Sequence, residues 1–304
     1  MKIEWKEINL ESRLILEPYY KYEQSKCCEI SFANNYLWAP FYEMKYAIVE
    51  DMLIFITKEK EELSVCVPFA KDEESASNMK KVLLLLEDYF QERNMRFKLH
   101  LVTEEKFAVL EELFPGKYEI IYDRDSADYV YETEKMISLA GKKLHGKRNH
   151  INKFKENNPN WSYEPLSHEN KEECLEMAEQ WKEINLCEEK GEKHEEFCIT
   201  RRAVTEFEEL GLRGGVLRDG ERIVAFTLGE ALNDQMFVVH IEKAFADVQG
   251  AYPMINQQFL AHEATEYLYV NREEDTGAEG LRKAKLSYYP AFLQEKGEVY
   301  IKNH

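Results

Sequence analysis

The sequence lacks several signatures that would assign a function at once. Its 304 residues include six cysteines but no Cys-x-x-Cys pair, so neither a common zinc site nor a thiol–disulfide redox motif is predicted. It also has no Walker glycine loop, no Gly-x-Ser-x-Gly elbow and no Rossmann glycine fingerprint, which argues against the standard nucleotide hydrolases, serine hydrolases and dinucleotide-dependent enzymes. We therefore expect no metal and no tightly bound cofactor.

Long apolar runs and a basic overall charge are missing as well. The longest aliphatic run, residues 82–86, is far shorter than the roughly 20 residues that cross a bilayer. The first residues do not read as a secretory signal, and together these absences predict a cytoplasmic chain. The 40 Lys and Arg residues face 58 Asp and Glu residues, a net charge of −18, so any polyanionic partner requires a local basic patch.

The helix and strand patterns indicate two similar halves. In the first half, a helix is expected at 11–28, strands at 46–49, 53–57 and 64–69, and a helix at 79–93. A strand at 97–103, a helix at 104–113 and extended segments at 118–122 and 129–131 follow. In the second half, a hairpin is expected at 214–229 because Arg218-Asp-Gly-Glu221 separates two β-rich runs. A strand at 237–241, helices at 199–210, 252–267 and 278–288, and a last strand at 298–301 complete this half.

This order of helices and strands predicts an α/β (α+β) protein built from two tandem units, each a mostly antiparallel mixed sheet flanked by helices. We place an N-terminal domain at 1–140, a basic linker helix at 141–160, and a C-terminal domain that carries the candidate site at 161–304. The charged run at 188–196 is interpreted as a plain solvated loop.

The linker is the most basic segment of the chain. Residues 141–155 carry six Lys or Arg residues and no acid. At helical spacing these cations project nearly all round the helix, which favours an anion site for the phosphates of a coenzyme, a phospholipid head group or a tRNA backbone. A surface helix paired to the acidic remainder of the chain is an equally open interpretation. The candidate phosphate ligands here are Lys143, Lys147, Arg148 and Lys153.

A second candidate site follows the strand at 237–241. Alternation along a strand puts His240 and Glu242 on one face, where a carboxylate can act as a general base toward an amine or hydroxyl. The turn Gln249-Gly250-Ala251 then opens a helix, and free backbone N–H groups at a helix start can hold a phosphate. The alternative is that these side chains only satisfy buried polar neighbours.

A third group of polar residues follows the strand at 268–270. Asn271, Arg272, Glu273 and Asp275 lie at the strand exit, and the next helix places Arg282, Lys285 and Tyr288 in one row. A tyrosine in that row can donate a proton to a leaving group, while the cations can hold a phosphate or carboxylate. A capped surface helix with internal ion pairs is the alternative.

Three of these stretches resemble a known family. The segments Lys143-Leu-His-Gly-Lys-Arg-Asn-His-Ile-Asn-Lys-Phe154, His240-Ile-Glu-Lys-Ala244 and Asn271-Arg-Glu-Glu-Asp275 with Gly280-Leu-Arg-Lys-Ala-Lys285 resemble a bacterial family related to the C-terminal catalytic domain of phosphatidylglycerol lysyltransferases. The resemblance implies tandem folds similar to Gcn5-related N-acetyltransferases (GNAT), as in the Fem ligases of peptidoglycan bridges. It further implies an aminoacyl-tRNA donor, whose phosphates would lie on the basic linker.

The sequence departs from these relatives in two places. It lacks the large membrane region of the lipid-modifying lysyltransferases, and of the coenzyme A loop of acetyltransferases only Gln249-Gly-Ala251 remains. We therefore predict an acyl or aminoacyl transferase acting on an amine, a hydroxyl or a lipid head group, with tRNA or coenzyme A carrying the donor. The alternatives are an acyl-CoA N-acyltransferase and a non-catalytic binding protein on the same fold.

The predicted roles divide the candidate residues into three groups. Glu242 would deprotonate the acceptor, with His240 beside it, and Tyr288 would assist the leaving group. The donor phosphates would be bound by Lys143, Lys147, Arg148, Lys153, Gln249, Gly250 and Ala251. The substrate would be bound by Asn271, Arg272, Glu273, Asp275, Arg282 and Lys285.

Overall fold

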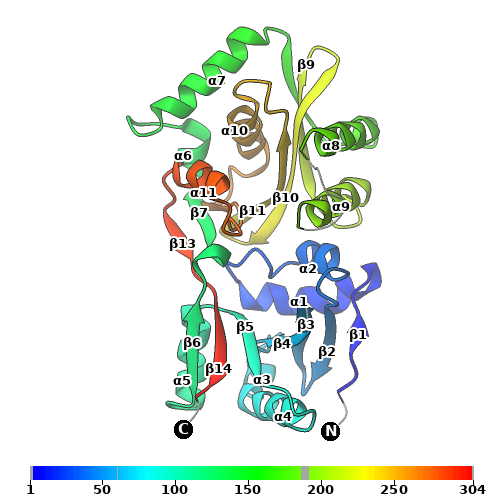
Figure 1. Cartoon of the computed structure of the whole chain (residues 1–304), viewed down its shortest axis with the longest axis vertical. Helices are drawn as coiled ribbons and strands as arrows, with labels where there is room; N and C mark the ends of the chain where they lie inside the picture. The colour runs from blue at the N-terminus through cyan, green and yellow to red at the C-terminus, as the bar shows by residue number, and fades with distance from the viewer. Residues whose placement is uncertain (1–2, 60, 186–191, 303–304) are drawn as a thin grey trace. The chain divides into compact units, whose positions relative to one another are not determined.

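The chain forms two compact units, each built on its own sheet. The computed structural model describes residues 3–59, 61–185 and 192–302 (Figure 1). Unit 1 comprises Met1–Asp128, Glu274–Gly277 and Leu293–His304, and unit 2 comprises Tyr129–Glu273 and Ala278–Phe292. Within these residues each sheet has seven strands, most strand pairs are antiparallel, and helices flank the sheets, so the predicted mixed α/β class is confirmed.

Unit 1 is organised around a sheet of order β1-β2-β3-β4-β5-β14-β6, in which β4 and β5 run parallel. Its strands are β1 (Lys6–Glu7), β2 (Lys45–Val49), β3 (Met52–Glu59), β4 (Glu62–Cys66), β5 (Lys98–Val102), β6 (Tyr118–Tyr122) and β14 (Gly297–Ile301). Its helices are α1 (Arg13–Glu23), α2 (Phe32–Trp38), α3 (Glu73–Ala76), α4 (Met79–Gln91) and α5 (Glu104–Leu113).

Local sequence explains several of these elements. Glu50 and Asp51 both adopt positive φ, 50° and 59°, which gives the β2–β3 hairpin the tight turn whose twist matches that of the strands. The apolar face of α4 buries Val82, Leu86 and Phe90 in the core cluster of this sheet. The period of 3.6 residues in 79–93 therefore identified both the helix and its buried face.

Unit 2 has a sheet of order β13-β7-β12-β11-β10-β9-β8, in which β11 and β12 run parallel. Its strands are β7 (Asp128–Glu132), β8 (Trp161–Pro165), β9 (Arg213–Asp219), β10 (Arg222–Asn233), β11 (Met236–Ala244), β12 (Tyr269–Asn271) and β13 (Phe292–Gln294). Its helices are α6 (Thr133–Ser138), α7 (His145–Asn157), α8 (Lys171–Asn185), α9 (Glu192–Thr205), α10 (Ala251–Glu263) and α11 (Glu279–Leu286).

The division of the chain differs from the expected one at 140 and 160. Strand β14, expected in the second half, pairs with β5 and β6 in unit 1 (Figure 1). Strand β7, expected in the first half, pairs with β12 in unit 2, and the basic helix α7 also belongs to unit 2. An apolar pattern in the sequence locates a strand but does not show which other strand pairs with it. Here the paired strands are more than a hundred residues apart in sequence.

Several helices have different bounds from those expected. The helix expected at 11–28 is α1, which ends at Glu23 before Gln24 adopts a left-handed conformation, and the helix expected at 199–210 is α9, which begins at Glu192. The helices expected at 252–267 and 278–288 are α10 and α11, which end at Glu263 and Leu286. Of the loop expected at 188–196, residues 188–191 lie outside the described residues and the rest belongs to α9. Among the described helices, none has both the length and the apolar character needed to span a membrane.

Candidate active site

The candidate site lies within unit 2, where two polar residues, His240 and Glu242, interrupt the buried strand β11. Val239, Ile241 and Lys243 are buried, but the strand is irregular here: Ile241 pairs with Leu228 and Val239 with Gly229, so His240 lies at a register shift in the pairing with β10. The two side chains nevertheless have different surroundings. Glu242 joins a cluster with residues of α7, α10 and the segments that follow β12 and α11, whereas His240 contacts two other carboxylates.

Glu242 is held through both of its carboxylate oxygens. Nη2 of Arg272 donates a hydrogen bond of 2.8 Å to Oε1, and Nδ2 of Asn256 donates one of 2.8 Å to Oε2. The side chains of Arg272 and Glu242 are only 12% and 11% exposed. The carboxylate is therefore fixed in orientation, while each oxygen keeps a lone pair for a further donor.

Arg272 lies against the rings of Tyr288 and Tyr131, which form an aromatic wall of the cluster. Its guanidinium carbon is 5.0 Å from the centroid of the Tyr288 ring, and that ring meets Tyr131 edge to face at 6.3 Å. Its Nη1 atom is buried and has no hydrogen-bond partner among the described residues. Burial raises the pKa of Tyr288 to about 12, although Arg272 partly offsets that rise, so the phenol keeps its proton at neutral pH.

Lys147 brings the basic helix α7 to the same aromatic wall. Its Nζ lies 3.9 Å from the centroid of the Tyr288 ring, which is a cation–π geometry. Burial, together with repulsion from Arg272, lowers the pKa of Lys147 to about 8, with Glu242 opposing the shift in part. Nζ of Lys143 lies in the same way over the ring of the neighbouring Tyr289, 5.2 Å from its centroid. Two lysines of the basic segment thus meet two consecutive tyrosines.

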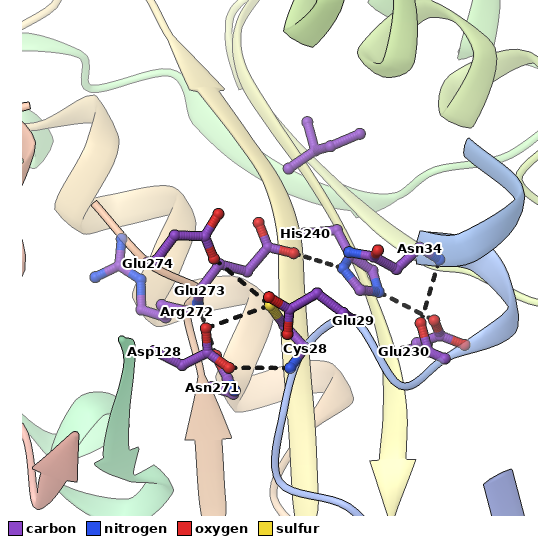
Figure 2. Close-up of polar contacts among 12 residues, drawn as sticks. Cys28, Glu29, Asn34, Asp128, Glu230, His240, Asn271, Arg272, Glu273 and Glu274 are labelled. Carbon is purple, nitrogen blue, oxygen red and sulfur yellow. Dashed lines mark hydrogen bonds and ion pairs between the residues drawn. The ribbon is translucent and has the colours of Figure 1, made fainter. Parts of the chain in front are cut away.

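His240 is held between two carboxylates, as Figure 2 shows. Its Nδ1 is 2.7 Å from Oε1 of Glu273 and its Nε2 is 3.0 Å from Oε1 of Glu230. Burial opposes a charge on the ring, but the hydrogen bonds to Glu230 and Glu273 outweigh it and raise the pKa of His240 to about 10. An imidazolium at neutral pH donates from both nitrogens, so His240 positions Glu273 rather than accepting a proton.

The segment that carries Arg272 is fixed by its neighbours in sequence. Glu273 has a left-handed backbone with φ of 58°, and its N–H donates to Oδ1 of Asn271 at 2.7 Å. Nζ of Lys285 donates to the carbonyl oxygens of Arg272 at 2.7 Å and Glu273 at 3.2 Å. These contacts stabilise an unfavourable backbone conformation and set the direction of the Arg272 side chain. Asn271, Glu273 and Lys285 are thus engaged in building the site.

Three of the predicted phosphate ligands lie away from the cluster. Arg148 donates from Nη1 to the carbonyl oxygens of Leu139 and Gly141, and thereby fixes the chain that leads into α7. Lys153 is exposed and pairs with Glu156 at 3.2 Å. Gln249 accepts a hydrogen bond of 3.4 Å from Nδ2 of Asn157.

Gly250 serves helix packing at the start of α10. It has a φ of 85°, and a Cβ there would lie 2.2 Å from the carbonyl oxygen of His150 and 3.0 Å from Cβ of Phe154. The absence of a side chain lets α7 approach the first turn of α10, which begins at Ala251. The role in phosphate binding expected for this glycine stays a prediction.

The two remaining candidates do not contact Glu242 in any described interaction. Arg282 lies in α11, half-buried, within unit 2. Asp275 belongs to unit 1, where it is fully buried, accepts from the Gly277 N–H at 3.0 Å and lies 3.5 Å from Nη1 of Arg124.

Sequence reasoning missed three residues of the site. Asn256 orients Glu242 from α10, Glu230 pairs with His240 from β10, and the hydroxyl of Tyr131 donates to the carbonyl oxygen of Lys285 at 2.8 Å. The available signal was a polar residue inside an apolar run: Asn256 follows Met254 and Ile255, and Glu230 stands between the run 223–229 and Ala231-Leu232. Such residues are buried with partners more often than by accident.

Unit 1 contains a second buried polar cluster that the sequence did not predict. Nζ of Lys296 lies 2.5 Å from Oε1 of Glu29, 2.7 Å from Oδ1 of Asp128 and 3.8 Å from Oε2 of Glu274. Sγ of Cys28 is 3.9 Å from the same nitrogen, and Figure 2 draws it beside Asp128. The three carboxylates and the thiol have the donor set of a metal site, but the ammonium group of Lys296 supplies their positive charge.

Comparisons with known proteins agree with this architecture. A structure of a conserved protein of unknown function from Bacteroides thetaiotaomicron is 35% identical, with a TM-score of 0.92, and the match covers 99% of this chain and 100% of that one. The structure of L-PGS from Bacillus licheniformis is 16% identical, with a TM-score of 0.67 and coverage of 100% and 95%. An uncharacterized protein, MYCGA3080 of Mycoplasmoides gallisepticum, is 27% identical over 194 residues, which span 61% of this chain and 60% of that relative's length.

More distant structures show the fold alone. FemX is 9% identical with a TM-score of 0.61, covering 99% of this chain and 98% of FemX. A tandem GNAT protein from clavulanic acid biosynthesis is 7% identical with a TM-score of 0.51, covering 99% of this chain and 98% of that protein. The predicted tandem GNAT-like fold is thus confirmed. Residues 21–297 match the family described as phosphatidylglycerol lysyltransferase, C-terminal, and the chain belongs to this family.

Proposed function

We propose that the chain transfers an activated aminoacyl group from an aminoacyl-tRNA to an amine or hydroxyl acceptor. The observation that carries this proposal is the pairing of a fixed carboxylate, Glu242, with a tyrosine, Tyr288, that keeps its proton at neutral pH. One group can accept a proton and the other can donate one, as acyl transfer requires. Membership of a lysyltransferase family supports aminoacyl transfer as the class of reaction.

The proposed reaction needs two proton transfers. Glu242 takes the proton of the acceptor N–H or O–H as that atom bonds to the ester carbonyl carbon. The tetrahedral intermediate then loses its ribose oxygen, and Tyr288 gives its proton to that leaving group. The proton on Glu242 returns to the Tyr288 phenolate, directly or through solvent, which restores both side chains. Arg272 orients Glu242 through Nη2, and its charge stabilises the transient phenolate.

The start of α10 favours an aminoacyl-tRNA over acyl-CoA as the donor. A coenzyme A pyrophosphate at that place would need open backbone N–H groups. The Ala251 N–H instead donates to the carbonyl oxygen of Val248 at 3.1 Å, and Pro253 has no N–H, which removes two of the donors of this helix start. The ester of an aminoacyl-tRNA does not depend on that helix start.

The experiment compares the two donors directly. Purified protein is incubated with labelled aminoacyl-tRNA or labelled acyl-CoA and a mixture of amines, polyols and phosphatidylglycerol vesicles. We expect label to move from the tRNA, and Glu242→Gln to lower the rate at least about 100-fold. Glu279→Gln is the matched control, because Glu279 is exposed in the same unit and pairs with Lys283.

Transfer from acyl-CoA alone would contradict the proposed donor. An unchanged rate for Glu242→Gln would remove that residue from the mechanism. Binding of donor without transfer to any acceptor would favour a non-catalytic protein.

A further inference from the structure

We propose that Lys147 and Nη1 of Arg272 form a subsite for one phosphodiester group, with the ring of Tyr288 as its wall. The subsite lies next to Glu242 and adds a binding site to the proposed function. Only the identity of its natural ligand rests on that proposed function. The phosphodiester we infer is one at the single-stranded 3′ end of a nucleic acid.

The first support is the unsatisfied donor on Arg272. Nη2 bonds to Glu242, but Nη1 is buried and has no hydrogen-bond partner among the described residues. Leaving a buried donor unpaired is unfavourable, and more so when the group is charged. A ligand oxygen at Nη1 would recover that cost. Arginine also suits phosphate oxygens because its planar N–H groups match their geometry.

The second support is the local balance of charge. Two cations, Lys147 and Arg272, share one carboxylate, Glu242, within the described part of the cluster. The ammonium of Lys147 rests on an aromatic face at 3.9 Å, which leaves its N–H donors available to an anion. A single negative charge neutralises the excess, in a chain whose net charge is −18. A phosphodiester carries one such charge at both pH 7 and pH 9.5, because it is a strong acid.

The third support is the surface next to the subsite. Lys143 stacks on Tyr289 at 5.2 Å, and that tyrosine is 52% exposed. Exposed aromatic rings beside lysines bind single-stranded nucleic acid, because bases stack on the rings while the cations contact the phosphates. A lipid head group has phosphate but no base, so it would not use Tyr289. This difference favours a nucleotide as the source of the phosphodiester.

Binding should depend on pH through the groups that face Lys147. These are the Tyr288 ring, the Arg272 guanidinium and the Glu242 carboxylate, of which Arg272 opposes and Glu242 favours the charge on Lys147. An anion adds favourable charge beside the ammonium, so binding is tighter when Lys147 is protonated. Above pH 8, near the pKa of Lys147 in the ligand-free protein, the affinity for the phosphodiester is expected to fall by up to about tenfold per pH unit.

The test measures binding of small phosphodiesters by isothermal titration calorimetry at pH 7 and pH 9.5. The probes are dimethyl phosphate, the dinucleotide CpA and glycerophosphoglycerol, with acetate as a non-phosphate anion. Lys147→Met should weaken dimethyl phosphate binding at least about tenfold at pH 7. Lys155→Met is the matched control: Lys155 lies on the same helix and stacks on Trp161 at 5.3 Å, and it should change binding less than about twofold.

Lys147→Arg separates charge from structure. Arginine stays protonated at both pH values, so this variant should bind dimethyl phosphate and lose the pH dependence seen in the parent protein. CpA should bind more tightly than dimethyl phosphate, and Tyr289→Ala should remove that gain without affecting dimethyl phosphate.

Equal effects of Lys147→Met and Lys155→Met would overturn the subsite, as would binding of acetate as tight as that of dimethyl phosphate, or no binding of any probe. Tighter binding of glycerophosphoglycerol than of CpA would overturn the nucleotide source. If the probes bind as expected but no aminoacyl group is transferred, the subsite is supported and the proposed function is rejected. If an aminoacyl group is transferred but no probe binds, the proposed function is supported and the subsite is rejected.

Discussion

The stability of unit 2 should fall as the pH rises through the titration of His240. The pKa of this ring is raised from 6.5 to about 10 in the folded protein, so its charge stabilises the fold fully below pH 6.5 and loses this effect as the pH rises through 10. Between these values the loss is about 1.4 kcal/mol per pH unit, or about 2.7 kcal/mol from pH 7 to pH 9. The His240→Gln variant, whose amide does not titrate, should lack this slope.

Urea unfolding at pH 7, 8 and 9 measures the effect. Replacing Trp5 and Trp38 with Phe in every protein leaves Trp161 and Trp181 as fluorescence reporters of unit 2. The difference in unfolding free energy between the parent and His240→Gln should shrink by about 2.7 kcal/mol over this range. Subtracting the variant cancels the other groups that titrate there, including Lys147.

The matched control is His262→Gln, since His262 is exposed and stacks on Tyr163 at 4.3 Å. This variant should keep the pH slope of the parent. A pH-independent difference between the parent and His240→Gln would refute the reasoning, because the ring would then be neutral between its two carboxylates.

Three further outcomes follow from single contacts. Tyr288→Phe keeps the ring that packs on Lys147 but removes the proton donor, so the transfer rate should fall about 10²–10⁴-fold. The control Tyr289→Phe, at an exposed position, should keep most of the transfer rate. Similar rates for the two variants would exclude Tyr288 as the acid. Lys296→Met leaves buried carboxylates without their ammonium and should destabilise unit 1 by about 3–5 kcal/mol at pH 7 by urea unfolding, whereas a loss below about 1 kcal/mol would show that they are not held as ions. Gly250→Ala places a methyl group against the carbonyl oxygen of His150 at positive φ and should lower the unfolding free energy by about 2–4 kcal/mol; an unchanged value would mean that α7 does not pack there.

The sequence predicted the elements better than their partners. Period-2 and period-3.6 patterns located β2, β3, α4 and α5, because each pattern reports which face of its own element is buried. The pairing of β14 with β5 and β6 depends on contacts between residues about 180 to 200 positions apart, which no local pattern encodes. The expected division of the chain therefore differed from the observed one.

The candidate site shows the same limit at the level of side chains. Alternation predicted Glu242 and His240 on one face of β11, but it revealed neither the register shift at His240 nor the two carboxylates, Glu230 and Glu273, that enclose the ring. The basic run in α7 was visible as composition, yet only Lys147 among its cations reaches the Tyr288 ring in a described contact. Charge and spacing suggest which chemistry is available, whereas the neighbours from distant segments decide which groups remain free to perform it.

The most direct test of the central claim is the structure of the protein with a stable analogue of the donor. A 3′-aminoacylamino-adenosine has an amide in place of the reactive ester and cannot be consumed by transfer. We predict that its carbonyl carbon lies within reach of an acceptor beside Glu242, with the hydroxyl of Tyr288 hydrogen-bonded to the 3′ nitrogen. An analogue bound elsewhere, with no contact to Glu242, Arg272 or Tyr288, would contradict the claim that this cluster performs the transfer.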